Sequence, residues 1–167
     1  RLHCNIHRGD SVFYFSTCGW MMWNWLVSCL MAGATAVVYE GSPFYPGPER
    51  LREMAEQEKL TMFGTSAKYL DAVRKADVVP AQVADLSSLR ILCSTGSPLS
   101  EDGFDFVYEG ITADIHLSSI SGGTDLMACF VLGCPVLPVY AGEIQVRALG
   151  MDVAILDDDG NPVTGCL

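Results

Sequence analysis

The sequence is poor in basic residues. It has 10 Lys and Arg against 20 Asp and Glu, so that its 167 residues carry a formal net charge of -10. A chain of this charge is not expected to bind nucleic acid or an anionic membrane non-specifically. A nucleotide is not excluded, because the local field in a pocket can differ from that of the whole chain.

Paired cysteine motifs are also absent. Seven cysteines are present, but none form a Cys-x-x-Cys. Cys129 and Cys134 are separated by four residues, and Cys4 and His7 make one loose pair. Because structural zinc sites usually need two tight pairs, reduced and buried thiols are favoured over metal coordination.

Motifs of other catalytic classes are missing as well. There is no Gly-x-Ser-x-Gly elbow, and His3, His7 and His116 have no convincing nucleophile beside them. The acidic run 157–159 lacks the later Glu of an EF-hand loop, so it predicts a solvated turn.

One long uncharged run is present, from Trp20 to Tyr39. Its 20 residues are enough to cross a membrane. No cluster of Lys or Arg flanks it, Gly33 is typical of a helix C-cap, and residues 35–39 are rich in β-branched side chains. A buried helix, a glycine and a strand are therefore favoured over a membrane span.

Apolar runs and helical patterns alternate along most of the chain. Strands are predicted over 12–16, 35–39, 60–63, 90–93 and 113–117. Helices are predicted over 20–31, 49–58, 67–75 and 100–108, with Ser66 and Ser100 as N-caps and a polar connector at 77–88. This order predicts an α/β fold with a mostly parallel, doubly wound sheet over residues 1–132.

The pattern changes after Asp125. Gly133, Pro135 and Pro138 interrupt any long helix, residues 142–146 alternate as in a strand, and 151–156 lead into a hairpin turn at 157–162. Residues 133–167 are therefore expected to begin a smaller, antiparallel β section.

Two loops of small residues, 94–98 and 118–125, each follow a predicted strand. Glycine lets a backbone approach a ligand closely, and ligands of open α/β sheets bind beyond the carboxyl ends of the strands. Thr124 and Asp125 would suit a phosphate oxygen and a magnesium ion. The alternative is a polar turn in which Asp125 caps a following helix.

Three stretches together resemble one family: Cys-Gly-Trp-Met-Met-Trp-Asn-Trp at 18–25, Ser-Thr-Gly-Ser-Pro at 94–98 and Ile-Ser-Gly-Gly-Thr-Asp at 120–125. In this order, and over nearly the whole chain, they resemble the acetoacetyl-CoA synthetases, which are adenylate-forming acyl-CoA synthetases. The resemblance implies part of a larger, cytosolic, adenylate-forming domain that converts acetoacetate and ATP to acetoacetyl-AMP and passes the acyl group to CoA, with magnesium. Ligases for another short-chain acid and a non-catalytic nucleotide-binding module stay open as alternatives.

The resemblance also implies roles for individual residues. Thr124 and Asp125 match the step that contacts the ATP phosphates and magnesium. The remaining nucleotide contacts match Thr95, Gly96, Ser97, Pro98, Ser119, Ile120, Ser121 and Gly123. The acyl pocket matches Trp20, Met21, Met22 and Gly122. In acetyl-CoA synthetases a bulky Trp matches Gly122, so glycine there implies room for a longer β-keto acid. For Trp23 and Trp25, core packing is the favoured interpretation.

Several parts of the family pattern are not found in this sequence. These are the upstream phosphate loop with its Lys, the downstream ribose-binding Asp, the hinge and the C-terminal domain with its catalytic Lys. The chain also opens on Arg1 without an initiator Met. We therefore expect a piece of a longer protein, inactive by itself.

Overall fold

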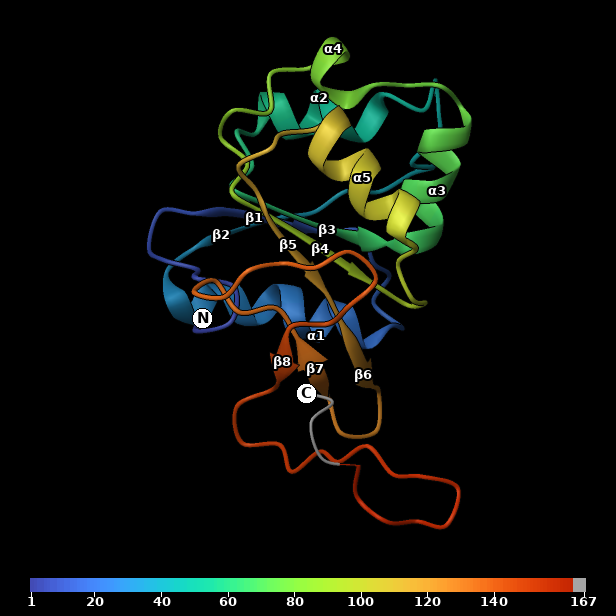
Figure 1. Cartoon of the computed structure of the whole chain (residues 1–167). Coiled ribbons are helices and arrows are strands. Elements are labelled where there is room, and N and C mark those ends of the chain that lie inside the picture. Colours follow the sequence, from blue (N-terminus) through green and yellow to red (C-terminus); the bar gives the residue numbers. More distant parts are fainter. Residues whose placement is uncertain (164–167) are drawn as a thin grey trace.

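The computed structural model describes residues 1–163 and contains two sheets (Figure 1). The larger sheet is parallel, in the order β2-β1-β3-β4-β5, and comprises β1 (Ser11–Tyr14), β2 (Thr35–Val37), β3 (Met62–Ser66), β4 (Ile91–Thr95) and β5 (His116–Ser119). The smaller sheet is antiparallel and comprises β6 (Ser121–Gly123), β7 (Ala128–Leu132) and β8 (Val146–Arg147). The predicted fold class, a parallel α/β core followed by a small antiparallel section, is confirmed.

Helices cover both faces of the parallel sheet (Figure 1). One face carries α2 (Arg50–Gln57), α3 (Ala67–Lys75), the short α4 (Pro80–Val83) and α5 (Glu101–Gly110). The opposite face carries α1 (Met21–Ser28), which continues into the 3-10 helix η1 (Cys29–Ala32). Because a parallel connection has to cross a face of the sheet, the alternation of strands and helices produces this doubly wound arrangement.

Alternate residues of the central strands enter two separate hydrophobic clusters. Phe13, Phe63 and Leu92 pack with the residues of α2, α3 and α5. Their neighbours Met62 and Cys93 pack with residues of α1 on the opposite face. Both faces are therefore dry, which explains why these strands are apolar almost throughout instead of alternating with polar residues.

The uncharged run 20–39 folds as α1, η1 and β2, so its interpretation as helix, glycine and strand is confirmed. Gly33 ends η1 with φ 75°, in the left-handed region that glycine adopts without steric cost. Within residues 1–163, no helix is long and apolar enough to cross a membrane.

Both predicted N-caps are confirmed. The Ser66 hydroxyl accepts a hydrogen bond from Tyr69 N at 3.1 Å, and the Ser100 hydroxyl accepts one from Gly103 N at 3.2 Å. The caps fix where α3 and α5 begin, on the residues that directly follow β3 and the β4 loop. The connector 77–88 differs from the prediction, since α4 begins there with Pro80 in its first turn, where a proline is well tolerated.

The segment after β5 differs most from the prediction. Residues 121–123 form β6, which pairs with β7 through a turn at 124–127. The alternative in which Asp125 caps a helix is therefore wrong, because a strand follows it. The change from parallel to antiparallel pairing falls between β5 and β6, and the division of the chain at residue 132 stays a prediction.

The last part of the chain contains less strand than expected. Of residues 142–146, only Val146 is in a strand, and 151–156 contribute one isolated bridge, from Leu156 to Pro162. The turn predicted at 157–162 is present, with Gly160 at φ 82°. The strands were over-predicted because alternation is only a local signal, whereas a strand also needs a partner edge.

Candidate active site

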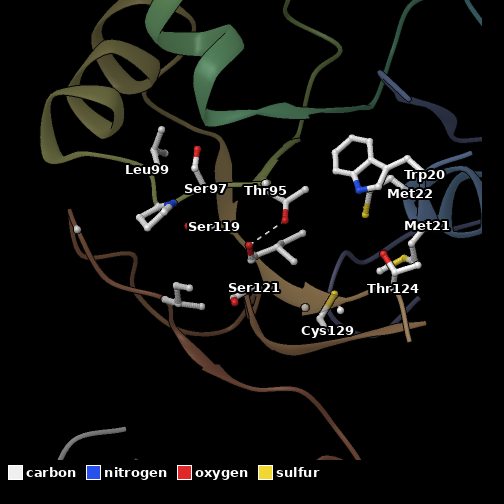
Figure 2. A pocket seen from close by; sticks show the side chains of 17 residues that line it. Trp20, Met21, Met22, Thr95, Ser97, Leu99, Ser119, Ser121, Thr124 and Cys129 are labelled. Atoms are coloured by element: carbon white, nitrogen blue, oxygen red, sulfur yellow. Dashed lines mark hydrogen bonds between the residues drawn. The ribbon is translucent and has the colours of Figure 1, made fainter. Parts of the chain in front are cut away.

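A cavity of about 390 Å³ opens at the carboxyl ends of β4 and β5 (Figure 2). Its walls come from residues 95–99 after β4, from 119–124 at the turn into the small sheet, and from 20–22 at the start of α1. Thr95 and Gly122 share this hollow, as predicted from the two loops. Its volume lies in the range of small-molecule sites, about 300–1,000 Å³.

Every residue predicted for the site except one lines this cavity. The predicted residues found in its wall are Trp20, Met21, Met22, Thr95, Gly96, Ser97, Pro98, Ser119, Ile120, Ser121, Gly122, Gly123 and Thr124. Asp125 is the exception, since it lies exposed on the β6–β7 turn, next to Thr124.

Four lining residues were missed: Leu99, Cys129, Gly142 and Ile144. Leu99 directly follows the predicted loop 94–98, so extending that loop by one residue would have included it. Cys129 pairs with Gly122 across the hairpin, so it could be found only once the β6–β7 register was known. Gly142 and Ile144 carry no local signal that places them there.

A hydrogen bond joins the ends of the two strands that line the cavity. The Thr95 hydroxyl donates to the Ile120 carbonyl oxygen at 2.9 Å (Figure 2). Ile120 N in turn donates to Ser94 O at 2.8 Å. The proton of Thr95 is thus used by the scaffold, which holds residue 120 beside β4 as the chain leaves the parallel sheet.

Aromatic and sulfur-containing side chains form the wall contributed by α1. Met21 and Met22 are buried, and the Trp20 ring meets Tyr14 edge to face with centroids 6.2 Å apart. Trp25 also contacts Tyr14, at 5.5 Å. Trp23 and Trp25 pack half-buried against the core cluster of this face, as predicted.

Gly122 pairs with Cys129 and lies close to the backbone of β7. A Cβ built on it would overlap the carbonyl oxygen of Ala128 and lie 3.0 Å from Cys129 Cα. At the adjacent Gly123, a Cβ would meet Leu126 at an ordinary 3.5 Å. A side chain at position 122 therefore requires β7 to move, in addition to whatever volume it takes from the cavity.

The cavity wall carries no charge. In the described part of the chain, no Asp, Glu, Lys, Arg or His side chain lines it. Burial raises the pKa of the Cys129 thiol to about 11, so this group is neutral at pH 7. What the wall offers a ligand is hydroxyl groups, glycine backbone and apolar surface.

Within residues 1–163, no three His, Cys, Asp or Glu side chains are grouped to hold a metal ion. Magnesium needs fewer protein ligands, because it is commonly held by one or two carboxylates together with the phosphates of a nucleotide. The exposed Asp125 carboxylate, beside the cavity residue Thr124, fits a metal that arrives with such a ligand.

A second hollow, of about 620 Å³, borders β7 and the turn before it. Its lining is mostly apolar and includes Cys4, Cys29 and Leu132, together with the polar residues Arg1 and His3 of the N-terminal segment. Cys129 belongs to the walls of both hollows.

A family model described as AMP-binding enzyme matches residues 2–166. The chain belongs to the AMP-binding enzyme family. Among its relatives is an acetoacetyl-coenzyme A synthetase of Rhizobium meliloti (strain 1021), 58% identical over 165 residues, which are 99% of this chain and 25% of that protein. A malonamoyl-CoA synthetase of Penicillium aethiopicum is 40% identical over 91% of this chain and 23% of that protein.

Among solved structures, the acetoacetyl-CoA synthetase from Streptomyces lividans superposes with a TM-score of 0.91 at 45% identity. The match covers 98% of this chain and 26% of that one. The resemblance inferred from the three stretches is confirmed, and the chain spans about a quarter of the length of the relatives it matches.

Proposed function

We propose that this chain is part of a ligase that activates acetoacetate with ATP and transfers the acyl group to CoA. The products are acetoacetyl-CoA, AMP and pyrophosphate. One observation carries the proposal: the three stretches that resemble acetoacetyl-CoA synthetases, far apart in the sequence, meet around one cavity. A cytosolic location is proposed on the same resemblance.

The nucleotide would occupy the side of the cavity formed by the strand ends. Residues 95–98 would pack against the adenine, with Ser119, Ile120, Ser121 and Gly123 completing the contacts. Thr124 and Asp125 would hold the phosphates and magnesium, which supplies positive charge against the phosphate oxygens when bound. Asp is one methylene shorter than Glu, so the metal would have to lie close to the turn.

The acid would occupy the side formed by Trp20, Met21, Met22 and Gly122. This wall is apolar and uncharged, which favours a short acyl chain and excludes water from the reacting carboxylate. A carboxylate oxygen attacks the α-phosphorus, pyrophosphate leaves, and the CoA thiol then displaces AMP from the acyl carbon. The described residues contribute mainly by fixing the two reactants in place.

The cations that this chemistry needs are not in the wall described above. An uncharged cavity does not by itself neutralise a triphosphate, which supports the prediction that the 167-residue chain is inactive alone. The purified chain should form no AMP from ATP when acetoacetate and CoA are added. AMP formation that depends on both would contradict this prediction.

A substrate panel on the full-length enzyme tests the function itself. We expect kcat/KM for acetoacetate to exceed that for acetate and for malonamate. Identity to a malonamoyl-CoA synthetase makes malonamate the second candidate, and a preference for it would replace our proposal. Binding of an ATP analogue without any acyl-adenylate would instead favour a non-catalytic module.

The metal role of Asp125 is tested with Asp125→Ala in the full-length enzyme. Adenylation should be lost while the fold is kept, because the variant removes the carboxylate proposed to hold magnesium. Asp105→Ala, which removes an exposed carboxylate on the outer side of α5, is the matched control. Near-normal pyrophosphate release by Asp125→Ala would remove Asp125 from this role.

The role of Gly122 in chain length requires two variants. Gly122→Trp should lower the ratio of acetoacetate to acetate turnover by filling the pocket. Gly122→Ala introduces the overlap with Ala128 without filling the pocket. An equal change of the ratio in both variants would show that displacement of the hairpin, and not the volume of the side chain, controls the selectivity.

A further inference from the structure

We propose that Gln145 is a positioning residue, whose side-chain amide fastens the loop 133–144 so that its end forms one wall of the cavity. This wall consists of Gly142 and Ile144. The kinetic consequence rests on the proposed function, whereas the structural claim does not.

Besides the Gln145 amide, the loop 133–144 is held at Gly133 by hydrogen bonds with His3 and Ser118, and at Val139 by packing against the core. Residues 133–144 contain no helix or strand, and much of the segment is exposed. The Gln145 amide contacts the first half of this loop, at residues 134, 137 and 138. Its Oε1 accepts from Cys134 N at 2.8 Å, and its two Nε2–H groups are shared among the carbonyl oxygens of Cys134 at 3.1 Å, Leu137 at 2.9 Å and Pro138 at 3.1 Å.

The orientation of this amide is determined by its partners. The Cys134 N–H can only donate and the three carbonyl oxygens can only accept, so exchanging Oε1 with Nε2 would lose all four contacts. Oε1 has a second partner in His116 Nε2, at 3.0 Å. Because Oε1 only accepts, His116 carries a proton on Nε2, and the acceptor and donor groups of the amide are all used.

Through His116, the amide connects the loop to the parallel sheet. His116 is the first residue of β5, whose last residue, Ser119, lines the cavity. Two residues along β5, Ser118 Oγ accepts from Gly133 N at 2.9 Å, so that β5 also holds the start of the loop. A Cβ on Gly133 would lie 2.5 Å from this oxygen, so the close approach requires glycine.

The distance from the fastening point to the cavity is short. Ile144 is bonded directly to Gln145, and Gly142 precedes Gln145 by three positions. Loss of the amide contacts would let the backbone at 134, 137 and 138 move. Residues 142–144 would then no longer be held in one position in the cavity wall. A positioning role therefore predicts a local effect, confined to the loop and to ligand binding.

The test uses the full-length enzyme with two variants of Gln145. Gln145→Met keeps the length of the side chain and removes all its hydrogen bonds. Gln145→Glu keeps an acceptor for Cys134 N but turns an oxygen toward the three carbonyl groups. Gln82→Met is the matched control, because Gln82 is an exposed residue of α4, outside the cavity wall.

Amide hydrogen exchange at Cys134 is the first readout. In Gln145→Met it should accelerate about tenfold, the effect of losing one hydrogen bond of typical strength. The amides of β3 and β4 should exchange as in the parent protein. Unchanged exchange at Cys134, or equal loss of protection across the parallel sheet, would overturn the proposal.

Steady-state kinetics with acetoacetate and ATP is the second readout. Both Gln145 variants should raise KM about tenfold and change kcat much less, while Gln82→Met should leave both constants unchanged. A tenfold fall in kcat with KM unchanged would contradict a positioning role. If the parent enzyme does not use acetoacetate, the proposed function fails, and exchange at Cys134 still decides the role of Gln145.

Discussion

The parallel sheet and the small antiparallel sheet are stabilised in different ways. In the first, helices bury both faces, and fully buried side chains such as Phe13 and Leu92 fill the space between layers. In the second, strands of two to five residues are partly exposed, and polar side chains hold the connecting backbone. His3 is an example, since its Nε2 accepts from Leu149 N at 3.0 Å while its Nδ1 donates to Gly133 O at 2.9 Å.

The cavity lies where these two regions meet, so its walls differ in rigidity. The wall from β4 and β5 belongs to a packed core, in which small displacements are resisted by many neighbours. The wall from residues 142–144 depends on a few hydrogen bonds at the surface, each of which contributes about 0.5–1.5 kcal/mol. We expect the second wall to be the one that adjusts when a ligand binds.

Two phenylalanines give the largest expected contrast between the regions. Phe104 of α5 is buried, at 2% exposure, whereas Phe130 of β7 is 41% exposed. Phe104→Ala should lower the free energy of unfolding by about 3–5 kcal/mol because it leaves a cavity in the core. Phe130→Ala should cost less than about 1 kcal/mol. Urea unfolding measures both, and similar losses would contradict the difference in burial between the two positions.

Two glycines sharpen the comparison inside the small sheet. Gly122→Ala should destabilise the protein by about 1–3 kcal/mol because its Cβ meets backbone atoms of β7, which cannot rotate away. Gly123→Ala, with only side-chain neighbours at 3.5 Å or more, should be nearly neutral. Thermal unfolding of the pair would contradict the observed register if Gly123→Ala were the more harmful variant.

An ion pair makes the stability of the parallel region depend on pH. Burial alone would raise the pKa of Asp10, but the hydrogen bond from His7 N and the pair with Arg90 outweigh it, so that the pKa is lowered. Asp10→Asn should therefore cost about 1–2 kcal/mol at pH 7. A lowered pKa adds stability that is lost on acidification, so the difference between the two proteins should narrow below about pH 4. Urea midpoints from pH 7 to pH 3 measure it, and a constant difference would contradict this assignment.

The smallest effect is expected at the turn 157–160. Asp157 Oδ1 accepts from Asn161 N at 2.8 Å and Asp159 N at 3.0 Å, on an exposed surface. Asp157→Ala should speed hydrogen exchange at these two amides without moving the unfolding midpoint. A lower midpoint would show that the turn contributes to the stability of the whole protein.

Where structure follows from neighbouring residues, the sequence was informative. The bounds of α3 were predicted correctly because Ser66 marks its start and an apolar stripe marks its length. The two loops at the carboxyl ends of β4 and β5 were predicted to meet because parallel strands place those ends at one edge of a sheet.

The remainder depends on partners distant in the sequence. β6 contains one serine and two glycines, a composition that predicts a turn, and it is a strand only because β7 pairs with it. Gln145 resembles any polar residue of a strand until its contacts with His116 and Cys134, 29 and 11 positions away, are known. Gly142 and Ile144 could not be assigned to the cavity for the same reason.

The position of Cys129 between the two hollows has a practical consequence. This residue borders both hollows, is 6% exposed and carries a thiol that is neutral at pH 7. Because maleimides react with thiolates, the raised pKa and the burial of Cys129 should leave it unlabelled at pH 7, while the exposed Cys18 reacts. Labelling of Cys129 would then report an opening of the β6–β7 hairpin, with no turnover required.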